Sequence, residues 1–569
     1  MNADTQRQQM ATPLMDPLER ALEGRPLVLL VGADPWRLPW LEAFAARQRE
    51  SGDMVALWDA AGDPLRPHSA LASLVAPFQS TVALEAPELL IGFGPELAAL
   101  AGDDGPLSRI ALPASERRLS RESEFNFRIL EASVRFLRTC LAQLPSASGR
   151  KLLVVAPAID RLDRLTLLAL DQLRRSEGRS VTIVIGLSNE AYRTLADDDE
   201  PERHLLGVEK ERRRFLRDFI RTTDPEVVKG PSEWDAPQAA ILAEFPNLPD
   251  EPGAILRAIQ AGQLDVALAS LTRPCSRLSR AERSRLLGLT HAYLGNFALA
   301  LDVYEQARVE AEDPISRARA SVYVALLLNK RLSELDRAQA VIETAMGEIS
   351  GLIDGNARLE RAWLFNVHAL VHFRRRENDA AFEKCREGLA EVKTVAGSDA
   401  MHLKVNLINN MSTLREVSGD PEGALLIWQR FQKLSGAGDP LFRKVFLFRN
   451  AALLDACGRP ADAYEAMLDC WRETETLSDV FHQAYVGYDL GVLAARLGQL
   501  QRAERWFERA GEAAVACRNS DAAARAKHAA ALVADAPNGI ATTNLGLTGS
   551  KLGRPFHLIH IPPITGASQ

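Results

Sequence analysis

The first place where this sequence could do chemistry is the turn after the apolar run at residues 26–32, PLVLLVG. A phosphate-binding loop at such a place reads G-x-x-x-x-G-K-[ST], because backbone N–H groups cradle the phosphates, the lysine reaches them and the hydroxyl binds Mg²⁺. Gly32 supplies the first glycine, but Asp34, Trp36 and Arg37 follow it, and the second glycine, the lysine and the hydroxyl are missing. Two prolines remove N–H donors as well. We therefore predict a degenerate loop and no cofactor.

The other half of such a site would be a strand that ends in adjacent acidic residues. The strand at residues 151–157, KLLVVAP, ends in alanine and proline instead. Asp160 and Asp163 come later, and helix capping is a sufficient role for them. The strand, loop and helix at residues 29–60 resemble the start of the signal-transduction ATPases with numerous domains (STAND). The resemblance implies a retained fold with a pseudo-ATPase site, and therefore a protein that is not an enzyme.

Metal chemistry has little support in the sequence. His368 and His372 lie four residues apart, a helical spacing that could bind a metal, but no acidic or cysteine partner is near them. The six cysteines are scattered and form no Cys-x-x-Cys pair. The basic helix expected at residues 208–221 is interpreted as a solvated face. No catalytic and no metal-binding residue is predicted.

Two folds are expected in succession. In residues 26–221, short apolar runs alternate with helical patterns, which predicts an α/β domain with a parallel sheet. Residues 222–252 contain six prolines and are expected to form a linker, and residues 1–25 a flexible N-terminus. From residue 253 to residue 535 no strand pattern remains. Helical periods recur there with a turn about every 40 residues, which predicts an all-α solenoid.

The solenoid repeat is visible in the spacing of three position classes. A turn residue is followed five positions later by alanine and nine positions later by an apolar residue, and in most units a small residue stands seven positions before it. The seven turn residues are Gly262, Gly295, Ser333, Arg376, Gly419, Gly458 and Gly498. This pattern resembles the tetratricopeptide repeat, in which two helices cross at a small residue. The resemblance implies about seven helix pairs that stack around a concave groove.

Binding is expected in that groove. In the register above, the residues ten and thirteen positions before each turn face the concave side. Asparagine side chains there could hold a peptide backbone, and tyrosine gives a rigid contact with a polar tip. The predicted groove residues are Tyr323, Trp363, Asn366, Asn406, Asn409, Tyr485 and Tyr488.

The leading interpretation is a non-enzymatic scaffold, adaptor or regulator that holds a segment of another protein. Two alternatives stay open: a nucleotide-responsive STAND-type regulator, and a carrier whose extended tail at residues 536–569 is bound or modified by a partner. The net charge of −7 argues against direct nucleic-acid binding. No long apolar stretch or signal peptide is apparent, so a cytoplasmic protein without a membrane partner is expected. The sequence leaves open whether the chain forms a homo-oligomer.

Overall fold

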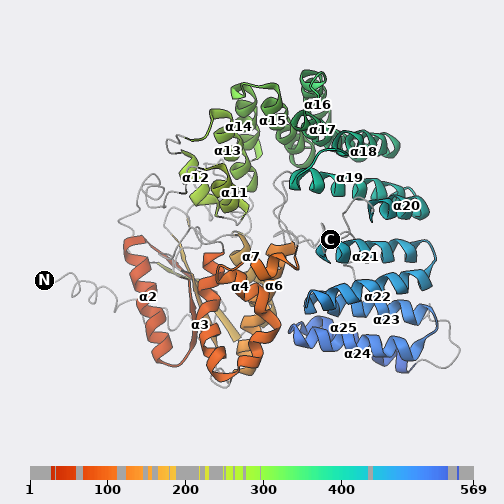
Figure 1. The fold of residues 1–569 in the computed structure, drawn as a ribbon. Helices are drawn as coiled ribbons and strands as arrows, with labels where there is room; N and C mark the ends of the chain where they lie inside the picture. The colour runs from red at the N-terminus through yellow and green to blue at the C-terminus, as the bar shows by residue number, and fades with distance from the viewer. Residues whose placement is uncertain are drawn as a thin grey trace.

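The computed structural model shows a parallel sheet with helices, followed by an arc of helix pairs (Figure 1). The structure describes residues 27–32, 34–58, 68–111, 124–144, 151–156, 164–177, 180–187, 225–229, 251–260, 263–272, 277–294, 297–432, 440–535 and 547–549, with residues 192, 217 and 248. The predicted fold class, an α/β domain before an all-helical repeat region, is confirmed. Among the described residues, no helix is long and apolar enough to cross a membrane.

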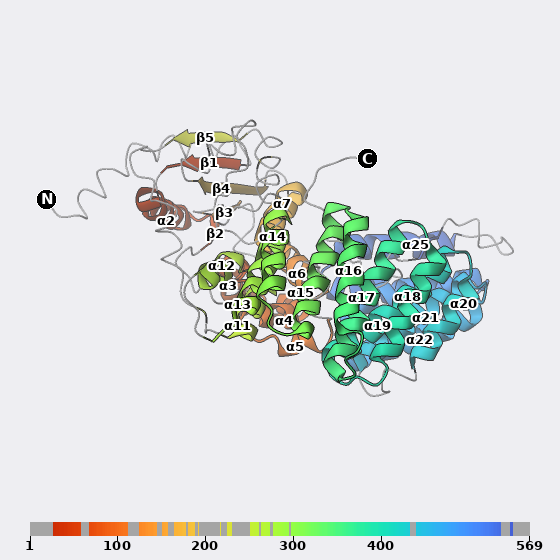
Figure 2. The same cartoon turned by 90° about the horizontal axis from the view of Figure 1, so that it is seen from above.

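Within these described ranges, the sheet has five parallel strands in the order β2-β3-β4-β1-β5, visible from above in Figure 2. Its strands are β1 (Leu27–Val31), β2 (Met54–Leu57), β3 (Leu152–Ala156), β4 (Val181–Leu187) and β5 (Glu226–Lys229). Every residue of β1, β3 and β4 is buried. Both faces of the sheet are covered by helices, and this is why these strands are uninterrupted apolar runs.

Alternate residues of β1 enter two different cores. Val28 and Leu30 pack with Phe44 of α2 (Asp34–Glu50). Leu27 and Leu29 belong to the larger core on the other face. The helices of that face are α3 (Ser69–Glu85), α4 (Gly94–Leu100), α5 (Gly105–Ser108), α6 (Glu124–Gln143) and α7 (Arg164–Glu177), with the short helix η1 (Pro87–Phe93).

Two strands were not predicted. β2 has four residues, too few to separate it from the helical pattern around it, although it pairs with β3. β5 lies inside the region expected to be a linker, and it pairs with β1 from Val28↔Glu226 to Val31↔Lys229. Only one of its four residues is buried, as in an edge strand, so the segment contains no apolar run. The sheet therefore continues into the predicted linker.

Seven helix pairs and a final single helix follow in the part of the chain that the structure describes. The pairs are α11 (Pro252–Gln260) with α12 (Leu264–Thr272), α13 (Arg280–Leu294) with α14 (Phe297–Glu310), α15 (Pro314–Leu327) with α16 (Leu335–Ile349), α17 (Gly355–Arg374) with α18 (Asn378–Val392), α19 (Ser398–Val417) with α20 (Pro421–Gln432), α21 (Pro440–Ala456) with α22 (Pro460–Thr476), and α23 (Val480–Arg496) with α24 (Leu500–Ala516). The last helix is α25 (Ser520–Ala534). The arc brings the last helices back to the side of α6 (Figure 1).

The three position classes have the predicted structural roles. The turn residues that the structure describes have positive φ, from 62° at Ser333 to 79° at Gly419, which ends each first helix in the left-handed region. The alanines five positions later and the apolar residues nine positions later are buried in all seven pairs. At the crossing, Gly288 lies against the ring of Tyr304 and Gly491 against the ring of Phe507. The small residue thus makes room for the apolar residue of the second helix.

A side chain at Gly491 is expected to disrupt this crossing. An added Cβ would lie 2.6 Å from the ring of Phe507, which is fully buried and cannot move into solvent. The Gly491→Val variant should lose about 1–3 kcal/mol of unfolding free energy through overpacking. Gly511→Ala is the matched control on α24, because its Cβ would meet only Ala526 at 3.8 Å. Chemical denaturation should show the control unchanged or slightly stabilised; equal losses in both variants would contradict the crossing geometry.

Candidate functional site

Gly32 lies at the carboxyl edge of the sheet, where open parallel sheets bind their ligands. Its N–H donates to the carbonyl of Leu187 at the end of β4, at 3.0 Å. The helix α2 already begins at Asp34, so two residues separate it from β1. The Gly32 N–H is therefore bound within the sheet. The side chains of Asp34, Trp36 and Arg37 lie outside the described residues.

The other chemistry-bearing residues that the structure describes do not form a second site. Asp160, Asp163 and most of residues 208–221 lie outside the described part of the chain. His368 and His372 stack with 4.7 Å between ring centroids, and Nδ1 of His372 lies 2.6 Å from a carboxylate oxygen of Glu377. In the described ranges, no group of three or more histidine, cysteine or acidic residues is arranged to hold a metal ion.

Two of the predicted groove aromatics lie in the packed interior. Tyr323 is 1% exposed, its ring stacks on Tyr304 with 5.3 Å between centroids, and its hydroxyl accepts a hydrogen bond from Arg285 at 3.1 Å. Trp363 is fully buried and stacks beside His402. The rings of Tyr323 and Trp363 therefore lie inside the packed array. The structure thus corrects the expected exposure of these two residues.

The three predicted asparagines lie on α17 and α19, together with Asn410, which was not predicted. We call Asn366, Asn406, Asn409 and Asn410 the amide row. The Oδ1 atom of Asn366 accepts hydrogen bonds from the side chains of Asn406, at 3.2 Å, and Asn410, at 3.1 Å. Asn366 is 2% exposed and Asn409 6%, so the structure corrects the expected exposure of these two asparagines as well. The Oδ1 atom of Asn409 is buried without a hydrogen-bond partner among the described residues. A buried acceptor without a donor costs about 1–3 kcal/mol and calls for an explanation.

The predicted tyrosines of α23 have partners within the chain. The hydroxyl of Tyr485 accepts a hydrogen bond from the side chain of Asn519 at 3.2 Å. Tyr488 is buried, its ring packs on Phe507, and the guanidinium of Arg525 lies 5.0 Å from its centroid. Because α25 covers this side of α23, these two rings contact the last helix and not open solvent.

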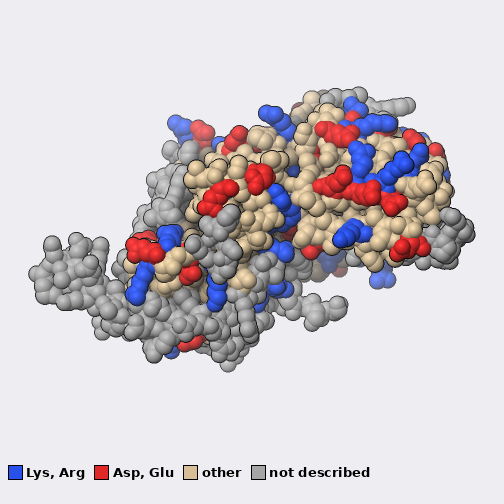
Figure 3. All heavy atoms as spheres, turned by 90° about the horizontal axis from the view of Figure 1, so that it is seen from below, with Lys and Arg blue, Asp and Glu red and all other residues tan. Residues whose placement is uncertain are grey.

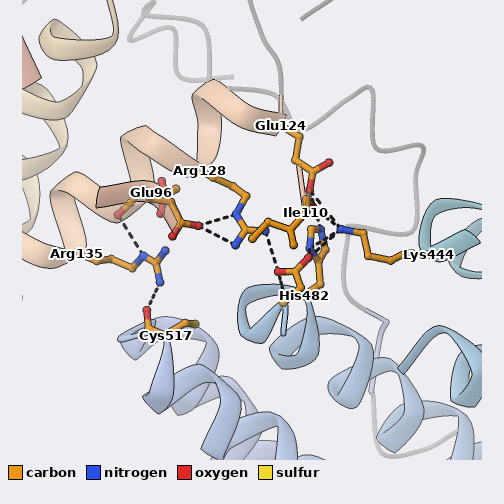
Figure 4. Close-up of polar contacts among 10 residues, drawn as sticks. Glu96, Ile110, Glu124, Arg128, Arg135, Lys444, His482 and Cys517 are labelled. Atoms are coloured by element: carbon orange, nitrogen blue, oxygen red, sulfur yellow. Dashed lines mark hydrogen bonds and ion pairs between the residues drawn. The ribbon is translucent and has the colours of Figure 1, made fainter. Parts of the chain in front are cut away.

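A second polar cluster joins the two folds, and the sequence did not predict it. We call the surface between the α/β domain and the last repeats the seam, and Glu96, Glu124, Arg128, Lys444, Asp479 and His482 the seam network (Figure 4). Arg128 of α6 pairs with Glu96 of α4 and with Asp479 at the start of α23, at 2.8 Å in both cases. Asp479 also caps α23 by accepting from the N–H of His482. One guanidinium thus links two domains.

Lys444 of α21 completes the network from a second repeat. Its Nζ donates to the carbonyl of Ile110 at 2.7 Å and to Asp479 at 2.9 Å, and it lies 3.8 Å from Glu124. The ring of His482 lies between the two carboxylates: Nδ1 is beside Asp479, and Nε2 is 3.3 Å from Glu124. All six network side chains are at most 5% exposed. Charges buried this deeply are tolerated only as a paired set.

Burial and ion pairing together shift the pKa values of the seam network. Burial alone would raise the pKa of Asp479, but Arg128, His482 and Lys444 outweigh it and hold that pKa well below its ordinary value. Burial would lower the pKa of Arg128, yet Asp479 and the two glutamates raise it. Burial lowers the pKa of His482 against the opposing effect of Asp479. The carboxylate of Asp479 is therefore ionised in the docked protein at neutral pH.

Close backbone packing continues the seam beside this network. Arg135 of α6 donates to the carbonyl of Cys517, which ends α24, and its guanidinium lies over the ring of Phe481. A Cβ added at Gly92 would overlap the backbone carbonyl oxygen of Ala516. The two folds are therefore in direct backbone contact at this glycine.

Part of the tail also contacts the last repeats. Residues 547–549 are the described residues of the predicted segment 536–569, and Leu547 packs against the core of the final pairs. A Cβ at Gly549 would lie 3.3 Å from a carboxylate oxygen of Asp489 on α23. The rest of the tail lies outside the described residues, so a role as a partner-bound or modified segment stays a prediction.

The chain matches no protein-family model and no curated protein. The second half of the chain is an array of helix pairs that resembles tetratricopeptide repeats. Among solved structures, a STAND protein with a tetratricopeptide-repeat sensor from Pyrococcus horikoshii is similar at 10% identity, with a TM-score of 0.39, over 91% of each chain. Aspartyl phosphate phosphatase F from Bacillus subtilis is similar at 12% identity, with a TM-score of 0.33, over 56% of this chain and 85% of that one.

A Rap protein complexed with competence and sporulation factor is similar at 13% identity, with a TM-score of 0.30, over 61% of this chain and 96% of that one. Likenesses this distant concern the fold alone. The function of the tetratricopeptide array in this chain depends on its own side chains, among which the amide row and the seam network stand out.

Proposed function

We propose that this chain is a non-enzymatic regulator whose tetratricopeptide array binds an extended segment of another protein. The observation that carries the proposal is the amide row. Asn366, Asn406 and Asn410 link two successive first helices by hydrogen bonds, and among the described residues the buried Oδ1 atom of Asn409 has no donor. An extended backbone presents N–H donors at regular intervals, and an asparagine amide can both accept from and donate to such a backbone.

The α/β domain acts in this proposal as an intramolecular partner of the array and not as an enzyme. The short connection from β1 to α2 and the use of the Gly32 N–H within the sheet support a pseudo-ATPase, because a phosphate loop needs several successive N–H groups directed at the ligand. The seam network supports a docking role for α6.

The charges on one face of the molecule favour a protein partner over a nucleic acid. On the face shown in Figure 3, lysine and arginine side chains are interspersed with aspartate and glutamate. A surface that binds a phosphate backbone collects positive charge on one face. The mixed charges support binding to another polypeptide.

Selection from a displayed library of extended peptides tests the proposal. Binders selected on the full-length protein should lose about tenfold in affinity to the Asn409→Leu variant, the effect of one lost hydrogen bond of about 1.4 kcal/mol. The same variant should melt no lower than the wild type, because leucine keeps the volume and removes the buried acceptor that lacks a donor.

Asn378→Leu is the matched control. Asn378 is on a second helix, and its side chain donates to Ser418 outside the amide row. Selected peptides should bind this control like the wild type. Equal affinity for all three proteins would refute the amide row as the binding element. A marked fall in the melting temperature of Asn409→Leu would assign Asn409 to stability instead.

A further inference from the structure

A cavity of about 340 Å³ opens on the seam, apart from the amide row. One wall is α6, with Arg135 and Arg138, and the other is the turn from α24 to α25, with Arg518 and Asn519. This volume is at the lower end of small-ligand sites. The cavity exists only where the two domains meet, so anything bound in it touches both.

Two of its arginines are poorly neutralised. Arg135, which is 7% exposed, donates to the carbonyls of Glu131 and Cys517, and Arg518 lies 3.5 Å from the side-chain oxygen of Gln143 and 3.4 Å from the carbonyl of Glu88. Among the described residues, neither arginine forms an ion pair with a carboxylate. Both guanidiniums therefore face uncharged oxygens at a domain boundary. Guanidinium groups are strongly bound by planar or tetrahedral oxyanions.

Two acidic groups lie nearby and offset part of this charge. Glu131 of α6 accepts a hydrogen bond from Gln172 at 3.5 Å; burial raises its pKa, and the charges of Arg135 and Arg138 oppose that rise. Asp521 is exposed on the first turn of α25. Among the described residues, the lining of the cavity contains three arginines and no acidic side chain.

We propose that this seam cavity binds a phosphoryl group, as inorganic phosphate or as a small phosphate ester, and that the bound anion fastens the α/β domain to the last repeats. The guanidiniums of Arg135, Arg138 and Arg518 supply the donors from both sides. The anion removes the repulsion between like charges that docking brings together. Docking is then sensitive to the phosphate concentration, independently of whether the amide row binds a peptide.

Titration of the full-length protein tests this, with inorganic phosphate in one arm and O-phosphoserine in the other, at ionic strength held constant with chloride. We expect saturable binding. We also expect bound phosphate to slow the alkylation of Cys517, because this thiol is 2% exposed at the seam. Cys385, fully buried within the repeats, reports on openings elsewhere and should not respond. Tighter binding of O-phosphoserine than of inorganic phosphate would indicate that the ligand is a phosphate ester. Equal binding of the two would indicate that the ligand is inorganic phosphate.

The Arg518→Gln variant should weaken phosphate binding about tenfold or more, because one charged donor is lost. Arg138→Gln is a second variant from the opposite wall, in case one substitution disturbs folding. Arg502→Gln, at the far end of α24, is the control, since Arg502 bonds to Gln499 and does not line the cavity. Absence of saturable binding, or equal binding by all variants, would overturn the proposal.

Discussion

The Asp479→Asn variant is expected to lose about 3–5 kcal/mol of stability, the usual cost of leaving a buried charge without its partner. Asparagine keeps the cap of α23, since it accepts from the His482 N–H as well as aspartate does. What it removes is the negative charge between Arg128 and Lys444, both buried. The loss therefore measures the charge pairing across the seam and not the helix cap. Thermal unfolding followed by circular dichroism gives the magnitude.

Asp313→Asn is the matched control for this prediction. Asp313 caps α15 by accepting from the N–H of Ser316 at 2.9 Å, but its carboxylate is exposed. Because asparagine and aspartate cap helices about equally, its substitution should change stability by less than about 1 kcal/mol. Similar losses in the two variants would show that the seam charges contribute nothing beyond capping.

The pH dependence gives Asp479 a second signature. An exposed aspartate has a pKa of 3.8, and the cations around Asp479 hold its pKa well below that value in the docked protein. A lowered pKa contributes stability that is fully present above the unfolded value and is lost as the pH falls through the folded value. Arg128, Lys444 and His482 face this carboxylate, with Glu124 behind the histidine. Acid titration of the wild type should show this loss below pH 3.8, and Asp479→Asn should lack it.

The repeat array could be predicted from the sequence because its determinants are local. Within one helix pair lie a turn residue such as Gly419, the alanine Ala424 and the buried Trp428. The spacing of these residues in the sequence therefore predicts where the two helices cross. The strands β1, β3 and β4 were equally predictable as apolar runs covered on both faces. β5 was not, because an edge strand with one buried residue has no pattern of its own.

The seam could not be predicted, because its contacts join residues far apart in the sequence. Arg128 and Asp479 are 351 residues apart, and each alone has the pattern of an ordinary helical surface charge. The same kind of tertiary contact explains why exposure was misjudged at Tyr485 and Tyr488. Register assigns a residue to a face of a helix, but only the tertiary arrangement shows that α25 covers that face.

Gly92→Ala is expected to open the seam without changing any charge. The added Cβ would overlap the carbonyl oxygen of Ala516, and a backbone atom can yield only if the whole of α24 moves away from η1. Gly94→Ala is the control two residues away, since nothing lies within 4 Å of its Cβ. Overpacking of an interior costs about 1–3 kcal/mol of unfolding free energy where side chains can adjust. A clash with a backbone atom should cost at least the upper end of that range.

Alkylation of individual cysteines separates opening of the seam from general unfolding. In Gly92→Ala, the rate at Cys517 should rise by about tenfold or more, because about 1.4 kcal/mol lost from docking raises the open population tenfold. Cys385 should react at its wild-type rate, since it is buried within a helix pair away from the seam. Faster reaction at both cysteines would mean that the fold itself is weakened. An unchanged rate at Cys517 would show that the two domains are not in close contact at Gly92.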